Sequence, residues 1–214
     1  MARLILASQS PRREALLGQI GLDFEVAPSD LEERLPEGMP PAEVAEKLAL
    51  DKAQAVASQR TEGLVIGADT VVVVDGKILG KPAGPKEARE MLRLLSGREH
   101  QVTTGIAVVD AASGRSRCDS VTTTVRFAPL GEEIIDRYVG TGEPLDKAGA
   151  YGIQGYGALL IEEIRGCYFN VVGLPLRRLA ELLGEFGYDA FAMCKKRGMK
   201  RLTTETPSTR RQSS

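Results

Sequence analysis

The chain has 214 residues, of which 43% are hydrophobic and 27% are charged, a composition that excludes a disordered or collagen-like chain and predicts one globular domain. The net charge of −1 conceals a contrast, because residues 195–214 carry seven of the 28 basic residues and one of the 29 acidic residues. The rest of the chain is therefore acidic, and no apolar run reaches the roughly 18 residues of a membrane helix. We expect neither nucleic acid nor a membrane as a partner.

The hydrophobic pattern predicts strands and helices that alternate along the chain. The expected elements are, in order, strand 3–7, helix 11–19, strand 24–27, helix 41–59, strands 64–74 and 77–79, helix 85–95, strands 101–109 and 120–127, helix 131–138, strand 158–164 and helix 175–184. This alternation predicts an α/β fold with a mixed sheet. We place one domain at residues 1–189 and a basic, flexible extension at residues 190–214, whose polar sequence offers little to bury.

The three cysteines, Cys118, Cys167 and Cys194, are odd in number and widely spaced. This pattern is typical of neither a disulfide framework nor a zinc site, so we expect a cytoplasmic protein. The single histidine, His100, excludes a metal cage built from several histidines. We interpret these four side chains as structural.

Residues 8–13, which read Ser-Gln-Ser-Pro-Arg-Arg, lie where a strand passes into a helix. The unpaired N–H groups at a helix N-terminus bind anions, and Ser8 and Ser10 add hydroxyl donors. Arg12 and Arg13 fall in the first turn, where the helix dipole disfavours cations. Two arginines there indicate a phosphate ligand, which guanidinium groups bind with two hydrogen bonds. A Ser10 cap followed by solvent-exposed arginines is the alternative.

Asp69 interrupts the apolar run at residues 64–74. A strand that is apolar on both faces lies in the middle of a sheet with both faces covered. A carboxylate there is costly unless it is paired or binds a metal. We interpret Asp69 as a general base or metal ligand; a structural acid that caps a loop is the alternative.

Lys52 lies within the apolar stripe of helix 41–59. From periodicity alone we expect it at the edge of that stripe, with its amine reaching water. Lys81 follows the predicted hairpin in a tight turn, where a lysine is ordinarily solvated. Placed in one pocket with Asp69 and the two arginines, the two lysines would suit a polyphosphate and its metal.

Two further segments are candidate ligand contacts. Residues 30–33 read Asp-Leu-Glu-Glu, which is either a solvated surface loop or a source of oxygen ligands for a hard cation such as Mg²⁺. Residues 149–157 contain four glycines, which let a ligand approach the backbone. Gln154 in this segment offers an amide to the edge of a base, although the spacing matches neither of the common glycine-rich nucleotide motifs.

Several segments, taken in order over residues 3–187, closely resemble the Maf family of nucleotide pyrophosphatases. They read LASQSPRR at 6–13, LALDKA at 48–53, GADTVV at 67–72, LGKP at 79–82, LSGREH at 95–100, TTG at 103–105, DKAGAYGIQG at 146–155 and NVVGLP at 170–175. The segment at 146–155 resembles the form found in the branch that hydrolyses dTTP and UTP. One departure lies at residues 30–33, where members often read Asp-x-Asp-Glu; here Glu32 replaces the second acid and Glu33 keeps the last.

The resemblance implies an elongated mixed sheet with flanking helices, shared with the inosine triphosphate pyrophosphatases, and a cleft between two lobes. It also implies a homodimer that hydrolyses a nucleoside triphosphate to the monophosphate and pyrophosphate with a divalent cation, Mg²⁺ or Mn²⁺. Asp69 matches the family's proton acceptor, and Arg12, Thr70 and Gln154 match positions that determine substrate specificity. The other matched roles are phosphate binding by Ser8, Arg12, Arg13, Lys52 and Lys81, catalysis by Lys52 and Lys81, and metal binding by Glu33 and Asp69.

The leading hypothesis is therefore a pyrophosphatase acting on dTTP and UTP, with modified pyrimidine triphosphates as further candidates. Two alternatives stay open. One is the same fold acting on 7-methyl-GTP or another modified nucleotide, although the 7-methyl-GTP branch lacks the Tyr-Gly-Ile-Gln run present at residues 151–154. The other is a nucleotide-binding regulator of cell division or septation, which would not need hydrolysis.

Overall fold

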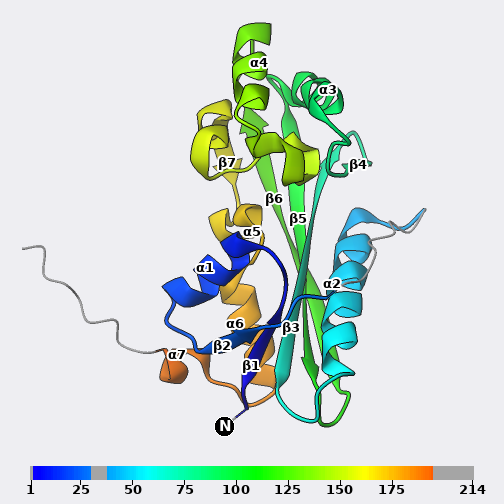
Figure 1. Cartoon of the computed structure of the whole chain (residues 1–214), viewed down its shortest axis with the longest axis vertical. Coiled ribbons are helices and arrows are strands. Elements are labelled where there is room, and N and C mark those ends of the chain that lie inside the picture. The colour runs from blue at the N-terminus through cyan, green and yellow to red at the C-terminus, as the bar shows by residue number, and fades with distance from the viewer. Residues whose placement is uncertain (1, 30–37, 195–214) are drawn as a thin grey trace, which may run out of the picture.

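The structure is a computed structural model that describes residues 2–29 and 38–194 (Figure 1). The elements are β1 (Leu4–Ala7), α1 (Pro11–Gln19), β2 (Phe24–Val26), α2 (Pro41–Ala57), β3 (Leu64–Val74), β4 (Lys77–Leu79), α3 (Pro85–Leu95), β5 (Glu99–Asp110), β6 (Ser116–Phe127), α4 (Glu132–Gly140), η1 (Glu143–Asp146), η2 (Ala148–Ala150), η3 (Gly155–Leu160), β7 (Ile161–Arg165), α5 (Tyr168–Val172), α6 (Leu176–Glu185) and α7 (Ala190–Met193).

One sheet forms the frame of the molecule. Its strands lie in the order β2-β1-β3-β5-β6-β7, with β4 paired to β3. β1 is parallel to β2 and β3, whereas the other pairs are antiparallel. The predicted α/β class with a mixed sheet is therefore confirmed.

The long strands β3, β5 and β6 run through both halves of the molecule (Figure 1). In the lower lobe, α2 covers one face of the sheet, while α1 and α6 cover the other. The upper lobe is built by α3 and α4 against the other ends of the long strands. Each lobe has its own apolar core, so the region where the lobes meet is left for polar side chains.

Successive residues of β3 point to opposite faces of the sheet. Leu64 and Ile66 pack in the core under α1 and α6, and Val65 packs against α2. The same alternation places Asp69 toward α2 and Thr70 toward the opposite face. Asp69 and Thr70, although adjacent in the sequence, can therefore contact a ligand from opposite faces of β3.

Glycines let α2 lie unusually close to the sheet. A Cβ atom at Gly67 would lie 2.0 Å from the carbonyl oxygen of Ala49, and one at Gly105 would lie 2.2 Å from the carbonyl carbon of Ala45. Both neighbours are backbone atoms of α2, so the helix itself would have to move. The close approach brings Lys52 of α2 down to β3.

We expect Gly67→Ala to lower the free energy of unfolding by about 2 kcal/mol or more, as overpacking in a core does. It should also lower activity, because α2 carries Lys52. Gly18→Ala is a matched control: Gly18 lies in α1 with nothing within 4 Å of its added Cβ, so it should leave stability unchanged or slightly raised. Urea unfolding measures the free energy of unfolding of both variants. Equal values would contradict this account of how α2 packs on the sheet.

His100 is buried in the upper lobe, as expected for a structural side chain. Its Nε2 lies 2.6 Å from the hydroxyl of Tyr151, and its ring meets Phe127 and Tyr151 edge to face. Burial lowers the pKa of His100 to about 4. The folded protein therefore holds this ring neutral over the whole physiological range.

We expect this burial to make stability depend on pH between 6.5 and about 4. The unfolded chain binds a proton at His100 near pH 6.5, whereas the folded chain binds it only near pH 4, so the free energy of unfolding falls as the pH falls through this window. The loss between pH 7 and 5 should be about 2 kcal/mol. Urea unfolding at both pH values measures it, and a His100→Phe variant should show a flatter profile.

Three differences between the structure and the prediction bear on the boundaries of the folded body and of the glycine-rich segment. Residues 158–160, predicted to begin a strand, belong instead to the 3-10 helix η3, and β7 starts only at Ile161. The short helix α5 was not predicted, because five residues carry no measurable helical period. Finally, α7 follows residue 189, and its Ala190 is part of the lower core, so the folded body extends past the predicted boundary. Residues 195–214 lie outside the described residues.

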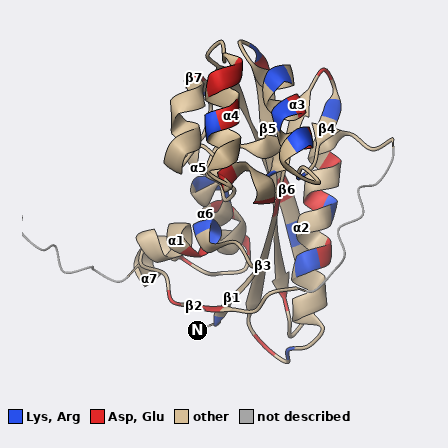
Figure 2. Cartoon of the chain, turned by 45° about the horizontal axis from the view of Figure 1, so that its top comes forward, with Lys and Arg blue, Asp and Glu red and all other residues tan. Residues whose placement is uncertain are grey.

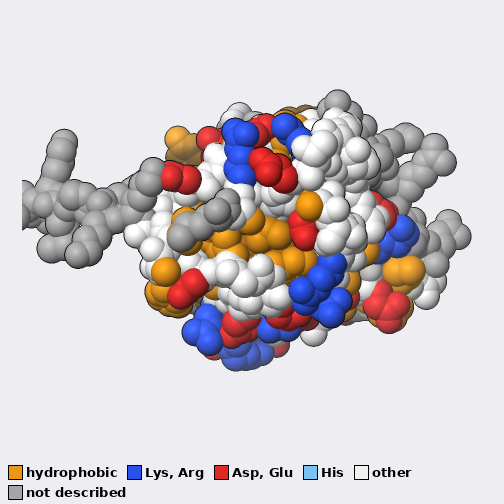
Figure 3. Space-filling model, turned by 90° about the horizontal axis from the view of Figure 1, so that it is seen from below, with side chains coloured by type: hydrophobic (Ala, Val, Ile, Leu, Met, Phe, Trp, Pro, Cys, Tyr) orange, Lys and Arg blue, Asp and Glu red, His pale blue; other side chains and the backbone are white. Residues whose placement is uncertain are grey.

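Charged and apolar side chains are distributed differently over the surface. Lysines and arginines are interspersed with acids on α2, α3 and α4 (Figure 2), and several pairs form ion pairs, such as Arg93 with Glu132. Seen from below, apolar side chains emerge between charged ones at the end of the molecule that carries β1, β2 and α7 (Figure 3). None of the helices in the described residues is both long enough and apolar enough to cross a membrane.

Candidate active site

A cavity of about 770 Å³ lies where the two lobes meet. It forms along one edge of β3, because β1 pairs with residues 64–67 of that strand and β4 pairs with residues 72–74. Within the described residues, no strand pairs with residues 68–71 on this edge. The cavity therefore opens at the carboxyl end of β1, where ligands commonly bind beside a parallel strand.

The structure brings together the predicted site residues that it describes. They line this one cavity: Ser8, Arg12, Arg13, Lys52, Asp69, Thr70, Lys81 and Gln154. Glu33, predicted as a metal ligand, and the rest of residues 30–33 lie outside the described residues. The shared position supports a common site, while the role of each side chain stays a prediction.

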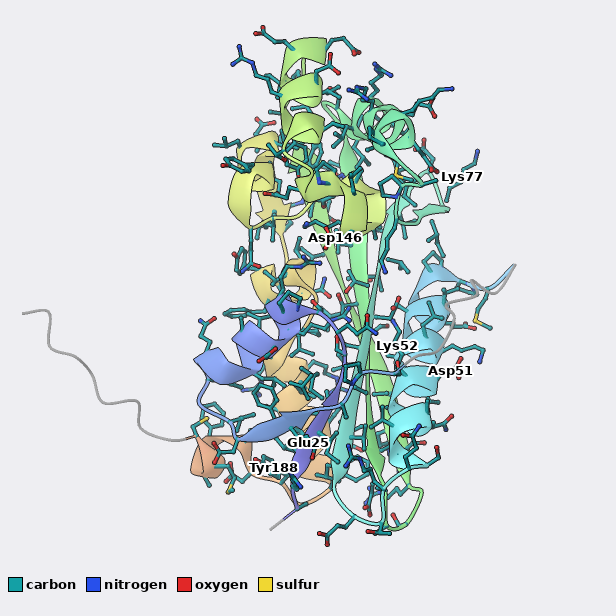
Figure 4. The ribbon with its side chains drawn as sticks, in the orientation of Figure 1. Glu25, Asp51, Lys52, Lys77, Asp146 and Tyr188 are labelled. Atoms are coloured by element: carbon teal, nitrogen blue, oxygen red, sulfur yellow. The ribbon has the colours of Figure 1, made fainter. Side chains whose placement is uncertain are left out.

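Asp69 and Lys52 form a buried ion pair within the cavity. Lys52 Nζ lies 2.5 Å from Asp69 Oδ1, and their side chains are 11% and 9% exposed. Figure 4 shows Lys52 on α2 beside the central strands. The expectation from periodicity that this amine reaches water is wrong, because the close packing of α2 on Gly67 and Gly105 directs it to the sheet.

Within the described residues, Arg13 donates to groups from three segments that are far apart in the sequence. Its Nε donates to the carbonyl oxygen of Gly173 at 2.8 Å, and its terminal nitrogens donate to Ser8 Oγ at 3.3 Å and Thr70 Oγ1 at 3.1 Å. Gly173 has φ of 120°, and a Cβ there would lie 3.3 Å from Thr70 Oγ1. A glycine is therefore needed where the α5–α6 connection approaches Arg13.

The connection from β1 to α1 is shaped by its serines. Ser10 is the N-cap of α1, as predicted, although its side chain makes no capping hydrogen bond to a described residue. Instead, the backbone N–H of Ser10 donates to Ser8 Oγ at 3.1 Å. Ser8 therefore links the cavity-lining turn to the Arg13 guanidinium.

Arg12 reaches across the cavity to the upper lobe. Its guanidinium lies 3.6 Å from Asp146 Oδ2, and Asp146 also accepts a hydrogen bond from Lys147 at 2.6 Å. In Figure 4, Asp146 lies in the upper lobe, above Lys52. The two lobes are thus joined at the cavity by side chains that are themselves accessible to a ligand.

Glu143 organises the glycine-rich segment that carries Gln154, and sequence reasoning missed it. Its carboxylate accepts hydrogen bonds at 3.0 Å from the Tyr138 hydroxyl and from the backbone N–H groups of Tyr156 and Gly157. Burial opposes the charge, but these backbone donors lower the pKa of the Glu143 carboxyl below its usual range. No sequence pattern marks an acid whose partners are backbone groups. These bonds also explain why residues 155–160 coil instead of extending.

We expect Glu143→Gln to loosen the segment at residues 152–157. The amide NH₂ would replace one acceptor oxygen and face an N–H or O–H donor, so one hydrogen bond must break. Because Gln154 belongs to this segment, KM for the nucleotide should rise about tenfold and kcat should change less. Steady-state kinetics measure both, with Glu133→Gln on the exposed face of α4 as the control; an unchanged KM would contradict this role of Glu143.

The residues of this cavity are compatible with a divalent cation only if a phosphate ligand supplies further oxygen atoms. Within the described residues, no three His, Cys, Asp or Glu side chains come together as a metal cage. Asp69 does place one carboxylate in a cavity with several basic side chains. Mg²⁺ is often held by one or two carboxylates together with phosphate oxygens, which is the donor set that this cavity and a bound nucleotide would supply.

Comparison with known proteins identifies the family. A protein-family sequence model with the description "Maf-like protein" matches residues 3–186 of this chain. The chain belongs to the Maf-like family. A dTTP/UTP pyrophosphatase of Moorella thermoacetica is 54% identical over 89% of this chain and 98% of its own length. A Clostridioides difficile protein of the same name is 50% identical over 86% of this chain and 94% of its own.

A solved structure, the Ham1 protein of Staphylococcus aureus, is also similar to this Maf-like chain. The two share 18% sequence identity with a TM-score of 0.44, over 74% of this chain and 79% of the other.

Proposed function

We propose that this chain hydrolyses dTTP and UTP to the nucleoside monophosphate and pyrophosphate. The observation that carries the proposal is the buried Asp69 carboxylate in a cavity whose other charged side chains are mainly basic: Arg12, Arg13, Lys52, Lys81 and Lys147, with Asp146 as the second acid. Such a lining suits a polyphosphate. The choice of nucleotide rests on the relatives of 50–54% identity, which are named dTTP/UTP pyrophosphatases.

In this proposal Asp69 is the general base. Its carboxylate accepts a proton from a water molecule, whose oxygen attacks the α-phosphorus. The bond from that phosphorus to the bridging oxygen breaks, and pyrophosphate leaves with the bond's electron pair. Lys52 holds the carboxylate in place, and Lys81 with the two arginines balances the charge that develops on the phosphate oxygens.

Asp69, together with Glu33, would also hold the divalent cation, Mg²⁺ or Mn²⁺. When bound, the cation neutralises phosphate charge and polarises the phosphoryl oxygens. Gln154 and Thr70 are neutral hydrogen-bonding groups at the cavity wall, and we assign them with Arg12 to recognition of the pyrimidine nucleoside. A homodimer and a cytoplasmic location stay predictions, the first of which light scattering tests.

Product analysis in ¹⁸O-labelled water tests the reaction. Attack at the α-phosphorus puts the label into the monophosphate and leaves the pyrophosphate unlabelled. We expect this result with dTTP and UTP in the presence of Mg²⁺. Label in pyrophosphate would place the attack at the β-phosphorus, and a diphosphate product would overturn the proposed reaction.

A further inference from the structure

Thr70 begins a series of hydrogen-bonded hydroxyl and amide groups that runs from β3 through β5 to α5. Thr70 Oγ1 on β3 lies 2.9 Å from Thr104 Oγ1 on β5, the residue opposite it in the sheet. Thr104 Oγ1 in turn lies 2.9 Å from the backbone carbonyl oxygen of Asn170 on α5. Thr104 and Asn170 are both fully buried, so no water competes for these groups. The mechanism proposed above uses neither of them.

The backbone carbonyl oxygen of Asn170, at the end of this hydrogen-bonded series, determines which hydroxyl is the donor in each bond. A carbonyl oxygen can only accept, so Thr104 must donate its single hydroxyl hydrogen to Asn170. Thr104 therefore has no hydrogen for Thr70, and the bond between the two hydroxyls must be donated by Thr70. The Arg13 guanidinium, which can only donate, occupies one lone pair of Thr70 Oγ1.

The Asn170 side chain fixes the position of this carbonyl. Its Nδ2 donates to the Val102 carbonyl oxygen and to Thr123 Oγ1, both at 2.9 Å, and its Oδ1 accepts from the Thr104 backbone N–H at 3.2 Å. Each amide atom is thus engaged by a different neighbour. The direction of the hydroxyl hydrogens is consequently built into the fold rather than adjusted when a ligand enters.

We propose that Thr104 and Asn170 are positioning residues that leave Thr70 Oγ1 with only a lone pair to offer a ligand. This lone pair accepts a hydrogen bond from the N3–H group of uracil or thymine. Phosphate oxygens are acceptors, so they would repel an oxygen of this kind, and Thr70 does not bind the phosphates. N3–H is the only hydrogen-bond donor on the base of dTTP and UTP, whereas cytosine carries an acceptor at that position. This inference rests on the proposed function and supplies a physical reason why the enzyme would reject CTP.

The test compares kcat/KM for UTP and CTP within each variant. A ratio is independent of the fraction of folded enzyme, so partial unfolding of a variant does not affect it. Thr104→Val removes the hydroxyl at nearly constant volume, which releases the Thr70 hydrogen for donation to N3 of cytosine. We expect the UTP:CTP ratio to fall roughly tenfold, the effect of one hydrogen bond.

Two controls separate this effect from a general disturbance of β5. Thr104→Ser keeps the hydroxyl, so its ratio should stay within about twofold of the wild type. Thr103→Val removes the hydroxyl of the neighbouring buried threonine, which pairs with Thr122 at 2.9 Å and points to the opposite face of the sheet. It removes one hydroxyl from a buried threonine of the same strand, on the face away from Thr70, and should leave the ratio unchanged.

A second measurement does not depend on Thr104. In 3-deaza-UTP a C–H group replaces N3–H, so the wild type should prefer UTP by about tenfold and Thr70→Val should lose that preference. The inference is overturned if Thr104→Val keeps the wild-type UTP:CTP ratio. It is also overturned if Thr70→Val still prefers UTP to 3-deaza-UTP but no longer prefers UTP to 3′-deoxy-UTP. Thr70 would then bind the ribose 3′-hydroxyl rather than the base. If the wild type hydrolyses neither UTP nor dTTP, the proposed function fails instead.

Discussion

Asp69→Asn is expected to lower kcat for dTTP and UTP by about 10²–10⁴-fold, the usual contribution of a general base. Asparagine has nearly the same shape and keeps an oxygen that can accept from Lys52, so the variant should fold. It cannot take a proton from water, so the loss should appear in kcat and much less in KM. Steady-state pyrophosphate release measures both constants.

Asp146→Asn is the matched control for this prediction. Asp146 is the other described carboxylate that lines the cavity, but its side chain is 67% exposed and pairs with Arg12 at 3.6 Å. We expect less than a tenfold loss in this variant. Comparable losses in the two variants would mean that removal of negative charge, rather than a missing base, slows the reaction.

Arg13→Ala is expected to lower kcat/KM by about 10²–10³-fold, through a higher KM and a lower kcat together. The change removes a cation from the cavity and also the bonds that join Gly173, Ser8 and Thr70. Arg13→Lys restores the charge but not the planar group that reaches three partners, so only part of the loss should be recovered. Recovery of the full wild-type rate by lysine would show that charge alone matters there.

The sequence predicted those parts of the site that depend on local pattern. Asp69 stood out because a carboxylate inside an apolar strand needs a reason to be there, and Ser8 to Arg13 stood out because a strand passes into a helix. The order of strands and helices followed from the same hydrophobic patterns. These features need only neighbouring residues, so one sequence suffices.

The features that escaped prediction depend on contacts between distant segments. Burial of Lys52 requires two glycines on β3 and β5 that no property of α2 reveals. Arg13 meets Gly173 across 160 residues. Glu143 binds backbone N–H groups, which have no residue type to recognise. In each case the chemistry is set by packing rather than by the periodicity of one segment.

The most direct test of the central claim is kcat/KM for pyrophosphate release across the eight common nucleoside triphosphates, 5-methyl-UTP and 7-methyl-GTP, with Mg²⁺ and with Mn²⁺. We predict pyrophosphate release that is fastest with dTTP and UTP, and that Asp69→Asn lowers by about 10²–10⁴-fold. A preference for 7-methyl-GTP or another purine would contradict the assignment of Thr70 and Gln154 to a pyrimidine. Absence of pyrophosphate from every nucleotide would contradict the hydrolytic function itself and favour a regulatory, nucleotide-binding role.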